Sequence, residues 1–418
     1  MKVVTLFTLS LLLTRCAFVE QIKYGTVRTQ SLAIEKIKLT TVTDAQDVVT
    51  NTPLQLQILA TDTSGTQFKT WYYDSANNNA IRKGNLTFRD FSFHCSIGTI
   101  DPVRGLLNVE NAGLELLERE QIKVTVFLNK NPKLQDSISL GLHFGGKVVL
   151  SFDGQNGIMA SNGKDGSDGS DGSDGFFGSD GSDGGDGEDG QDGDDGNDGK
   201  DGKDLQIDIA YIFTQNQGKM VLFEISDFKE VRTVLFEPAI QGLLSVSANG
   251  GHGSDGGRGG SGGDGGDGGD GGDDNDGAGG DGGNGGDSGD GGDGGDGGDG
   301  GNGGNIVICY QENQSELLSY LKISNSGGRC GDGGRGGSNG SAGNGGSGGD
   351  FSPIPIISTT GNYSNGTNGS SGSGSSFSAR SGWSGTQGKD GSVAYRIATF
   401  EEMFGNYADR TFQDIDEE

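Results

Sequence analysis

The first pattern along the chain is a short-range alternation of apolar and polar residues between residues 25 and 153. Alternation with a period of two is typical of strands that bury one face, and turn-forming residues separate the runs. About seven runs of this kind occur, so the sequence predicts an all-β domain. The clearest runs are residues 54–59, 86–94, 122–128 and 138–144.

Two short motifs within this domain resemble the signature of bacterial immunoglobulin-like surface modules. They are Gly98-Thr-Ile-Asp-Pro-Val-Arg-Gly105 and Ile122-Lys-Val-Thr-Val126. The number of strands also suits an immunoglobulin-like β-sandwich. The resemblance covers residues 25–153 alone, and it implies a role as a stalk or an adhesin spacer.

Alternation returns in three later segments. Residues 205–248 predict a small β region of four strands, and residues 306–326 predict a β-hairpin or a connector. Residues 392–418 predict a strand, a short helix capped by Thr399, and an acidic tail.

Between the β segments the period changes from two to three. Glycine occupies every third position from Gly154 to Gly202 except at Ala160, and Asp closes most of the triplets. This acidic tract, residues 154–204, is collagen-like in spacing, and the pair Phe176-Phe177 keeps its phase. None of the 6 Pro lies in the tract, whereas collagen normally relies on Pro for stiffness.

Residues 249–305 carry a denser repeat, Gly-Gly-Asp. Before Asp273 the second glycine of each triplet follows the main glycine column, and after Ala278 it precedes that column. The residues between them, Asp, Asn and Gly, favour a turn. This change of phase predicts two rods, residues 256–272 and 279–304, of roughly 50 and 80 Å at about 3.1 Å per residue. Residues 327–391 predict a third Gly-Gly-x tract followed by loops rich in Gly, Ser and Asn.

Glycine at two of every three positions leaves two bare faces on a three-residue helix, so that neighbouring backbones can approach and exchange hydrogen bonds. The repeat resembles the polyglycine II bundles of certain antifreeze proteins and phage tail-tip adhesins. A collagen triple helix and plain disorder are the alternatives, because ordering glycine costs much conformational entropy. The predicted fold class is mainly β: an immunoglobulin-like sandwich, then a polyglycine II bundle interleaved with short β segments.

Composition and charge restrict the kinds of partner that the chain can bind. The 418 residues include 84 Gly, and the net charge is −29. Residues 163–204 hold 14 Asp, 1 Glu and 3 Lys, and residues 250–305 hold 13 Asp and 1 Arg, so each tract carries −12. Such rods repel nucleic acids and anionic membranes and attract divalent cations.

Calcium is the one ion that this sequence suggests, because carboxylates are hard oxygen ligands. The weak candidates are Asp273, Asp274 and Asp276 at the turn. The simpler interpretation is that the Asp stripes only keep the rods soluble, and no cofactor is predicted.

The N-terminus, residues 1–16, is typical of an export signal, with Lys2 followed by an apolar run from Val3 to Leu13. The segment ending at Cys16 resembles a bacterial lipoprotein box, which implies lipidation of Cys16. Arg15 departs from that box, and simple cleavage is the alternative. The resemblance implies a surface-exposed lipoprotein of a bacterial outer membrane, or otherwise a secreted protein.

Three further cysteines allow at most one disulfide within the chain. Cys309 and Cys330 flank one short segment between glycine tracts and are the predicted pair. Cys95 lies in a strand pattern and is predicted to be a buried free thiol.

Nothing in the sequence indicates an enzyme. His94, His143 and His252 are scattered, and no nucleophile or phosphate-loop motif has the required context. The sequence therefore predicts a non-enzymatic cell-surface protein with a structural or adhesive role. The alternative is an accessory lipoprotein of an outer-membrane transport, secretion or assembly complex. Its partner would be an outer-membrane protein or a cell-surface ligand.

Overall fold

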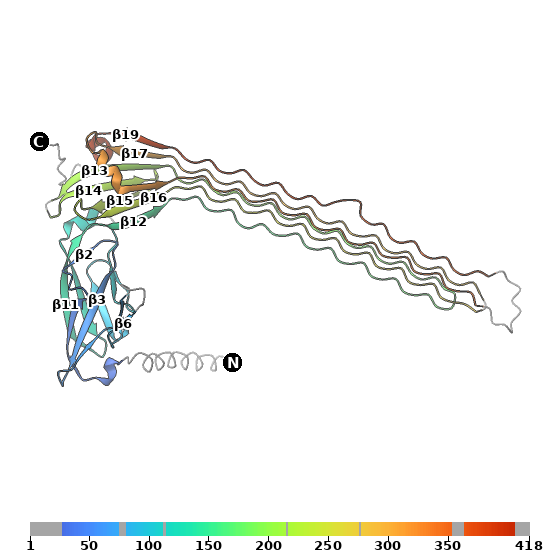
Figure 1. The fold of residues 1–418 in the computed structure, drawn as a ribbon, viewed down its shortest axis with the longest axis horizontal. Coiled ribbons are helices and arrows are strands. Elements are labelled where there is room, and N and C mark those ends of the chain that lie inside the picture. Colours follow the sequence, from blue (N-terminus) through green and yellow to red (C-terminus); the bar gives the residue numbers. More distant parts are fainter. Residues whose placement is uncertain are drawn as a thin grey trace.

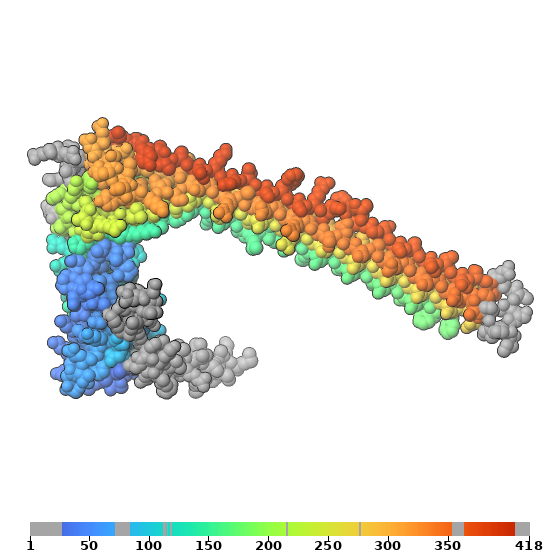
Figure 2. Space-filling model, viewed as in Figure 1, coloured from blue at the N-terminus to red at the C-terminus, as the bar shows by residue number. Residues whose placement is uncertain are grey.

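The protein consists of a β-rich head and a long, narrow arm that leaves the head at a wide angle (Figures 1 and 2). The computed structural model describes residues 27–74, 81–111, 114–214, 216–275, 277–352 and 363–405. The signal segment with Cys16, the turn residue Asp276 and the acidic tail lie outside the described residues. The described chain is mainly β, as the alternation predicted.

The first unit of the head contains two facing sheets and a small ribbon. One sheet has the order β1-β3-β9-β8 with β4 paired to β3, and the other has the order β2-β11-β10-β7. The strands are β1 (Ile34–Thr41), β2 (Asp47–Val49), β3 (Leu54–Asp62), β4 (Gln67–Lys69), β7 (Phe91–Cys95), β8 (Thr99–Ile100), β9 (Leu106–Asn108), β10 (Gln121–Leu128) and β11 (Asn131–His143). The ribbon pairs β5 (Tyr72–Asp74) with β6 (Ile81–Lys83), and the 3-10 helices are η1 (Thr29–Ser31), η2 (Phe88–Asp90) and η3 (Leu114–Glu118).

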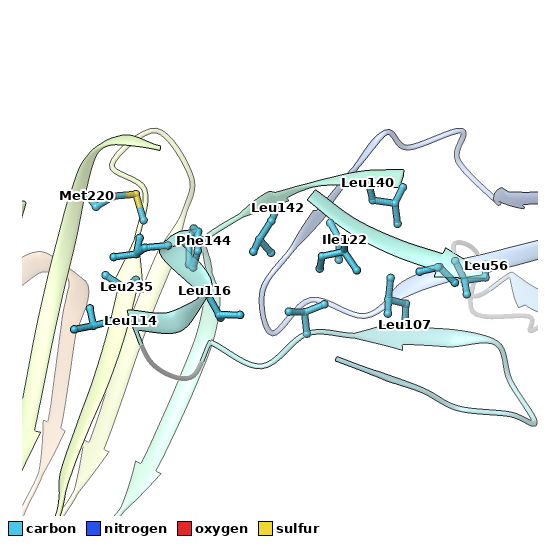
Figure 3. Packing of buried hydrophobic residues seen from close by; sticks show 14 of the residues in the cluster. Leu56, Leu107, Leu114, Leu116, Ile122, Leu140, Leu142, Phe144, Met220 and Leu235 are labelled. Carbon is cyan, nitrogen blue, oxygen red and sulfur yellow. The ribbon is translucent and has the colours of Figure 1, made fainter. Parts of the chain in front are cut away.

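Alternate residues of these strands fill the space between the two sheets. Leu56, Leu107, Ile122 and Leu140 are fully or almost fully buried, and they converge in Figure 3. A Cβ on Gly105 would lie 2.2 Å from the Phe88 ring, and Gly105 has a φ of +69°. The core therefore requires glycine at the end of the 98–105 motif.

The second unit of the head contains the remaining strands in two further sheets, with orders β12-β16-β18 and β15-β14-β13-β17-β19. Their bounds are β12 (Gly146–Ser151), β13 (Leu205–Thr214), β14 (Gly218–Ser226), β15 (Val231–Phe236), β16 (Gly242–Ser247), β17 (Ile306–Tyr310), β18 (Leu321–Ser324) and β19 (Val393–Ile397). A second hydrophobic core, including Ile207, Phe223 and Ile308, lies between these sheets.

This arrangement changes one boundary expected from the sequence, and it excludes one of the two alternatives, a hairpin or a connector, for residues 306–326. Strand β12 lies within the span assigned to the first unit, 25–153, but it pairs in parallel with β16 of the second unit. Residues 306–326 are not a hairpin. Strand β17 pairs with β13 and β19, β18 pairs with β16 in the other sheet, and η4 (Ser315–Tyr320) connects them.

The two units share one continuous core. Phe144, Leu114 and Leu116 of the first unit lie beside Met220 and Leu235 of the second (Figure 3). Polar contacts reinforce this joint: Leu235 N–H donates to Asn111 Oδ1 over 3.0 Å, and Glu237 accepts from Phe144 N–H over 2.8 Å. The two units of the head are therefore packed together as one body, from which the arm extends.

The chain ends its described part with helix α2 (Phe400–Phe404), which packs Met403 and Phe404 into the first core. Thr399 caps this helix through a capping box with Glu402, as the sequence predicted. Among the described residues, none of the helices has the length and apolar character needed to span a membrane.

Candidate functional site

The arm consists of six extended segments of the described chain, which we call rods 1 to 6. They are residues 153–175, 179–204, 248–273, 279–305, 325–350 and 363–392. Rods 1, 3 and 5 run outward from the head, and rods 2, 4 and 6 return (Figure 1). Hydrogen bonds join rods 1, 3 and 5 into one layer and rods 2, 4 and 6 into a second. A rod of 26 residues is about 80 Å long at about 3.1 Å per residue.

Backbone hydrogen bonds join the rods both within and between the layers. Within a layer, Gly163 N–H donates to the Arg258 carbonyl over 2.7 Å and Gly256 N–H to the Asp332 carbonyl over 2.9 Å. Between layers, the bonds are antiparallel, as where Gly260 N–H donates to Gln191. The pattern repeats every three residues, so most glycine amides in the arm are satisfied by backbone carbonyls without a side-chain core.

The head fixes the register of the rods. Each rod continues directly from a strand: β12, β16 and β18 lead into rods 1, 3 and 5, and rods 2, 4 and 6 lead into β13, β17 and β19. Ser151 faces Ser247 in the β12–β16 pair, a separation of 96 residues. The same separation of 96 residues recurs in the bond from Asp270 N–H to Asp174 Oδ1, near the far end of rod 1.

The glycine columns follow from the close approach of the backbones. A Cβ on Gly263 in rod 3 would lie 2.0 Å from the Ser167 carbonyl oxygen, and one on Gly262 would lie 2.1 Å from the Gly289 oxygen. Rod 3 touches four neighbours and has two glycines per triplet. Rods 1 and 6 lie at the edges and mostly have one. Side chains on the outward positions of rods 1 and 6 therefore terminate the lattice.

The Asp stripes do more than keep the rods soluble. In most triplets of rods 3 to 6 the third residue has an N–H without a backbone acceptor, and an Asp or Asn side chain of the neighbouring rod accepts from it. Asp168 Oδ1 accepts from Asp264 N–H over 2.9 Å, and Asp296 Oδ1 accepts from Trp383 N–H over 2.7 Å. His252 Nδ1 takes the place of a carboxylate and accepts from Arg329 N–H. The stripe therefore belongs to the hydrogen-bonding scheme of the arm.

One break in the glycine columns is repaired by polar side chains. Ala160 replaces glycine in rod 1, and Ser254 replaces glycine in the facing column of rod 3. Ser254 Oγ donates to the Ile158 carbonyl over 2.7 Å and accepts from Asn197 N–H over 2.9 Å. The hydroxyl thus bridges the gap that the alanine methyl group creates.

A second break lies where Asn339 occupies a glycine column of rod 5. Its Oδ1 accepts from Gly291 N–H over 2.9 Å, and its Nδ2 donates to the Phe377 carbonyl. Rod 6 contains one extra residue here. Ser373 N–H donates to Asp287 Oδ1, a separation of 86 residues in sequence, whereas Arg380 N–H donates to Asp293 Oδ1, a separation of 87. The asparagine amide therefore stands in for a peptide group and absorbs a slip of one residue.

The turn between rods 1 and 2 forms an exposed aromatic tip at residues 176–178. The side chains of Phe176 and Phe177 are 76% and 92% exposed, and Phe177 has a φ of +49°. Ser179 Oγ braces the turn by accepting from Phe176 N–H over 2.8 Å. A bulky residue in the left-handed region is uncommon and is associated with functional positions. The pair is a candidate binding element.

The structure adds to the sequence analysis in two tracts. The collagen-like tract 154–204 is divided into rods 1 and 2, because Phe176-Phe177 forms a turn although it keeps the glycine phase. The region 363–391, expected to be loops, forms rod 6, since one glycine per triplet suffices at an edge. The structure also reverses the chain between residues 273 and 279, where the phase of the glycines changes.

The predicted disulfide between Cys309 and Cys330 is wrong, because both residues are free thiols. Cys309 is buried on β17, where its Sγ accepts from Arg396 Nε over 3.3 Å, and burial raises the pKa of its thiol. Cys330 occupies a glycine column of rod 5 instead. Cys95 is also free but only half-buried, which differs from the buried thiol predicted.

The predicted ion-binding and histidine positions do not assemble into one site. Asp273 Oδ1 accepts from Asp350 N–H over 2.8 Å, so it belongs to the ladder of carboxylates. Among the described residues, no group of three or more His, Cys, Asp or Glu could hold a metal ion. His94 is exposed on β7, whereas His143 pairs with Glu237 at the joint of the head over 3.0 Å.

Comparison with known families agrees with the repeat. Residues 152–206 match the family of the collagen triple helix repeat (20 copies). This part of the chain therefore carries collagen-like repeats, which are typical of structural, extracellular modules. No curated protein and no solved structure gave a significant match.

The close contact at Gly263 yields a test of the lattice. We expect Gly263→Ala to lower the free energy of unfolding by about 1–3 kcal/mol, because the methyl group must displace a backbone rather than a flexible side chain. The gain from restricting the unfolded chain, about 0.4–1 kcal/mol, is smaller. Chemical unfolding monitored by circular dichroism measures the change. Ser341→Ala, exposed in rod 5, is the control, and equal effects of the two would contradict the contact.

The carboxylate ladder predicts sensitivity to acid. Hydrogen bonds from the backbone N–H and the hydroxyl of Thr367 lower the pKa of Asp281 below its ordinary value of 3.8, and Thr386 does the same for Asp299. A depressed pKa in the folded state stabilises the fold above the ordinary pKa, and that contribution is lost as the pH falls through the depressed value.

The arm should therefore lose stability as the pH falls below about 4. The double variant Asp281→Asn with Asp299→Asn keeps the acceptor oxygens but removes the two titrating groups. Its acid-unfolding curve should fall less steeply below that pH than the curve of the unchanged chain. Asn284, which already accepts from Ser370 N–H over 2.9 Å, shows that the amide fits this position. Superimposable curves would contradict the assignment.

Proposed function

We propose that this protein is a rigid, non-enzymatic cell-surface module that carries an adhesive tip away from its base. The observation that carries the proposal is the continuous hydrogen-bonded arm with the exposed Phe176–Phe177 turn at the far end of rods 1 and 2. In this proposal the first unit of the head is an immunoglobulin-like sandwich, and the arm is a polyglycine II bundle.

The period and the direction of the hydrogen bonds support a polyglycine II bundle. Bonds recur every three residues, and each inner rod bonds to neighbours in both layers. A collagen triple helix joins three parallel strands, whereas here the matched segment folds back on itself: Gln191 N–H of rod 2 donates to the Lys164 carbonyl of rod 1 in the antiparallel sense. The collagen-like spacing therefore supports three-residue helices that pack in antiparallel layers and not as a parallel triple helix.

The rigidity of the arm supports a role in presentation. Every inner triplet is held by backbone bonds on several sides, so bending the arm would break many bonds at once. A preorganised aromatic pair at a rigid end suits binding, because aromatic residues bury much area and little freedom is lost on contact. Asp174 and Asp180, close in sequence on either side of the turn, give the tip an acidic rim, which favours a partner with a basic rim.

Attachment to the cell is the second part of the proposal. The export signal and the lipoprotein-like segment support a lipid on Cys16 and a place on the bacterial outer membrane, with plain secretion as the alternative. A protein held in this way could also serve as an accessory subunit of an outer-membrane complex. Mild detergent extraction separates the two roles, because a subunit would leave the membrane in a stoichiometric complex.

The tip can be tested by adhesion. Beads coated with the full chain should attach to intact cells of the producing organism, and the variant Phe176→Ser with Phe177→Ser should reduce attachment at least tenfold. The matched control Phe213→Ser with Phe228→Ser removes two exposed phenylalanines of the head, 46% and 74% exposed, and should attach normally. Equal attachment by the tip variant and the unchanged chain would sink the adhesive role of the tip.

The lipid anchor can be tested by labelling. Cells that express the full chain and receive labelled palmitate should incorporate the label, and Cys16→Ser should abolish it because the thiol is the attachment point. Cys95→Ser is the control, since that cysteine lies in the folded head. Label that survives Cys16→Ser would exclude this anchor.

A further inference from the structure

Strand β19 is an apolar edge strand whose outer side meets no other strand of the described chain. It is the last strand in the order β15-β14-β13-β17-β19, and it lies at the outer border of the head, in line with rod 6 (Figure 1). Tyr395 is 61% exposed and Ile397 is 60% exposed, and Val393 is 37% exposed. These three alternate residues share one face, because side chains along a strand alternate with a period of two.

The same three residues direct their backbone groups away from the sheet. Ser392 accepts from Ile306 N–H over 2.8 Å, and Ala398 N–H donates to the Tyr310 carbonyl over 3.0 Å. Residues 392 and 398 therefore face β17. Because backbone groups alternate along a strand, those of Val393, Tyr395 and Ile397 face outward.

The opposite edge of this sheet is protected, and β19 is not. On β15, Asn111 of the first unit bonds both the N–H and the carbonyl of Leu235. Natural proteins usually blunt a free edge with proline, a bulge or inward charges. Strand β19 has no proline, it pairs with β17 without a register shift, and its one charged residue, Arg396, lies on the other face.

Charge favours the side of the molecule that carries β19 for contact with a second copy. Residues 325–392, which form rods 5 and 6 and lead into β19, hold 3 Asp against 3 Arg and 1 Lys, a net charge of +1. Residues 163–204 in rods 1 and 2 carry −12. A contact at β19, where this near-neutral flank ends, therefore keeps the acidic rods 1 and 2 of the two copies apart.

We propose that β19 pairs in the antiparallel sense with β19 of a second copy and joins the two heads through one continuous sheet. With the two-fold axis at Tyr395, Tyr395 faces Tyr395 of the second copy, and Val393 faces its Ile397. The outward backbone groups of these residues then exchange hydrogen bonds, and the apolar side chains meet on one face. Arg396 faces Ala394 of the second copy, so the two arginines do not oppose each other.

This pairing has a distinctive shape. Because β19 runs parallel to rod 6, an antiparallel partner directs its arm the opposite way. The dimer would be a long rod with a tip at each end and both heads in the middle. The contact uses the same patch on both copies, so it closes at two and does not form filaments.

Sedimentation velocity and small-angle scattering on the full chain without its export signal test the pairing. We expect a concentration-dependent dimer whose maximum dimension is close to twice that of the monomer. Tyr395→Pro removes an outward N–H, and Ile397→Lys places a charge in the contact. Each should weaken dimerisation at least tenfold. Val149→Lys, on an equally exposed residue of β12 (62%), is the control and should not change it.

Cross-linking gives an independent readout that does not depend on folding of the proline variant. Tyr395→Cys should form a cross-linked dimer under mild oxidation, whereas Lys389→Cys on rod 6 should not, because antiparallel copies separate those positions. A monomer at every concentration tested, a dimer that survives Ile397→Lys, or equal cross-linking at the two positions would overturn the proposal. These outcomes are independent of adhesion by the Phe176–Phe177 tip.

Discussion

The arm depends on one requirement. Its backbone N–H and carbonyl groups must form hydrogen bonds with neighbouring rods, because the arm has no core of side chains. Glycine at the contact positions lets rods approach until amides of one rod reach the carbonyls of the next, as between Gly263 and Glu188. A single methyl group would overlap a carbonyl oxygen at these positions. The composition, the period and the two-layer arrangement all follow from this approach, and so do the Asp side chains that accept from N–H groups without a backbone partner.

The head supplies what the rods lack. A lattice of identical triplets could slip by three residues and lose bonds only at its ends, since each row resembles the next. The strands cannot slip in this way, because residues such as Phe223 and Ile308 must remain in the core of the second unit. The pairing of β12 with β16, and of β13 with β17, therefore selects one register among many and passes it to the rods. A small hydrophobic core thus determines the alignment of a much longer structure.

The sequence predicts this architecture in part. Period-two and period-three patterns indicated a β-rich chain with glycine rods, and the collagen-like repeat is confirmed by the family match. The turn at Phe176-Phe177 was missed, because its residues keep the glycine phase and lack the usual turn composition. Rod 6 was missed since an edge rod needs fewer glycines. The wrong pairing of Cys309 with Cys330 arose because proximity in sequence does not show that Cys309 lies in strand β17 of the head and Cys330 in rod 5 of the arm.

The candidate site was less predictable than the fold. Nothing local marks Phe177 as exposed at the end of the arm, since that follows from the position of the turn in three dimensions. The Asn339 bridge has a faint sign in the sequence, a polar residue where the column calls for glycine. The role of Asn339 as a bridge follows only from the structure, which places Gly291 and Phe377 on either side of its amide group.

The bridge at Asn339 also bears on how such an arm can change length during evolution. Lengthening one rod by a triplet leaves its neighbours without partners at the far end, so insertions are tolerated best when all six rods gain a triplet together. Insertion of a single residue would ordinarily shift every bond beyond it. Between Ser373 and Arg380 the chain accommodates one extra residue, and the shift is confined to one edge rod. An edge rod beside an amide side chain is therefore the place where this lattice can accept a single-residue insertion while the other rods keep their register.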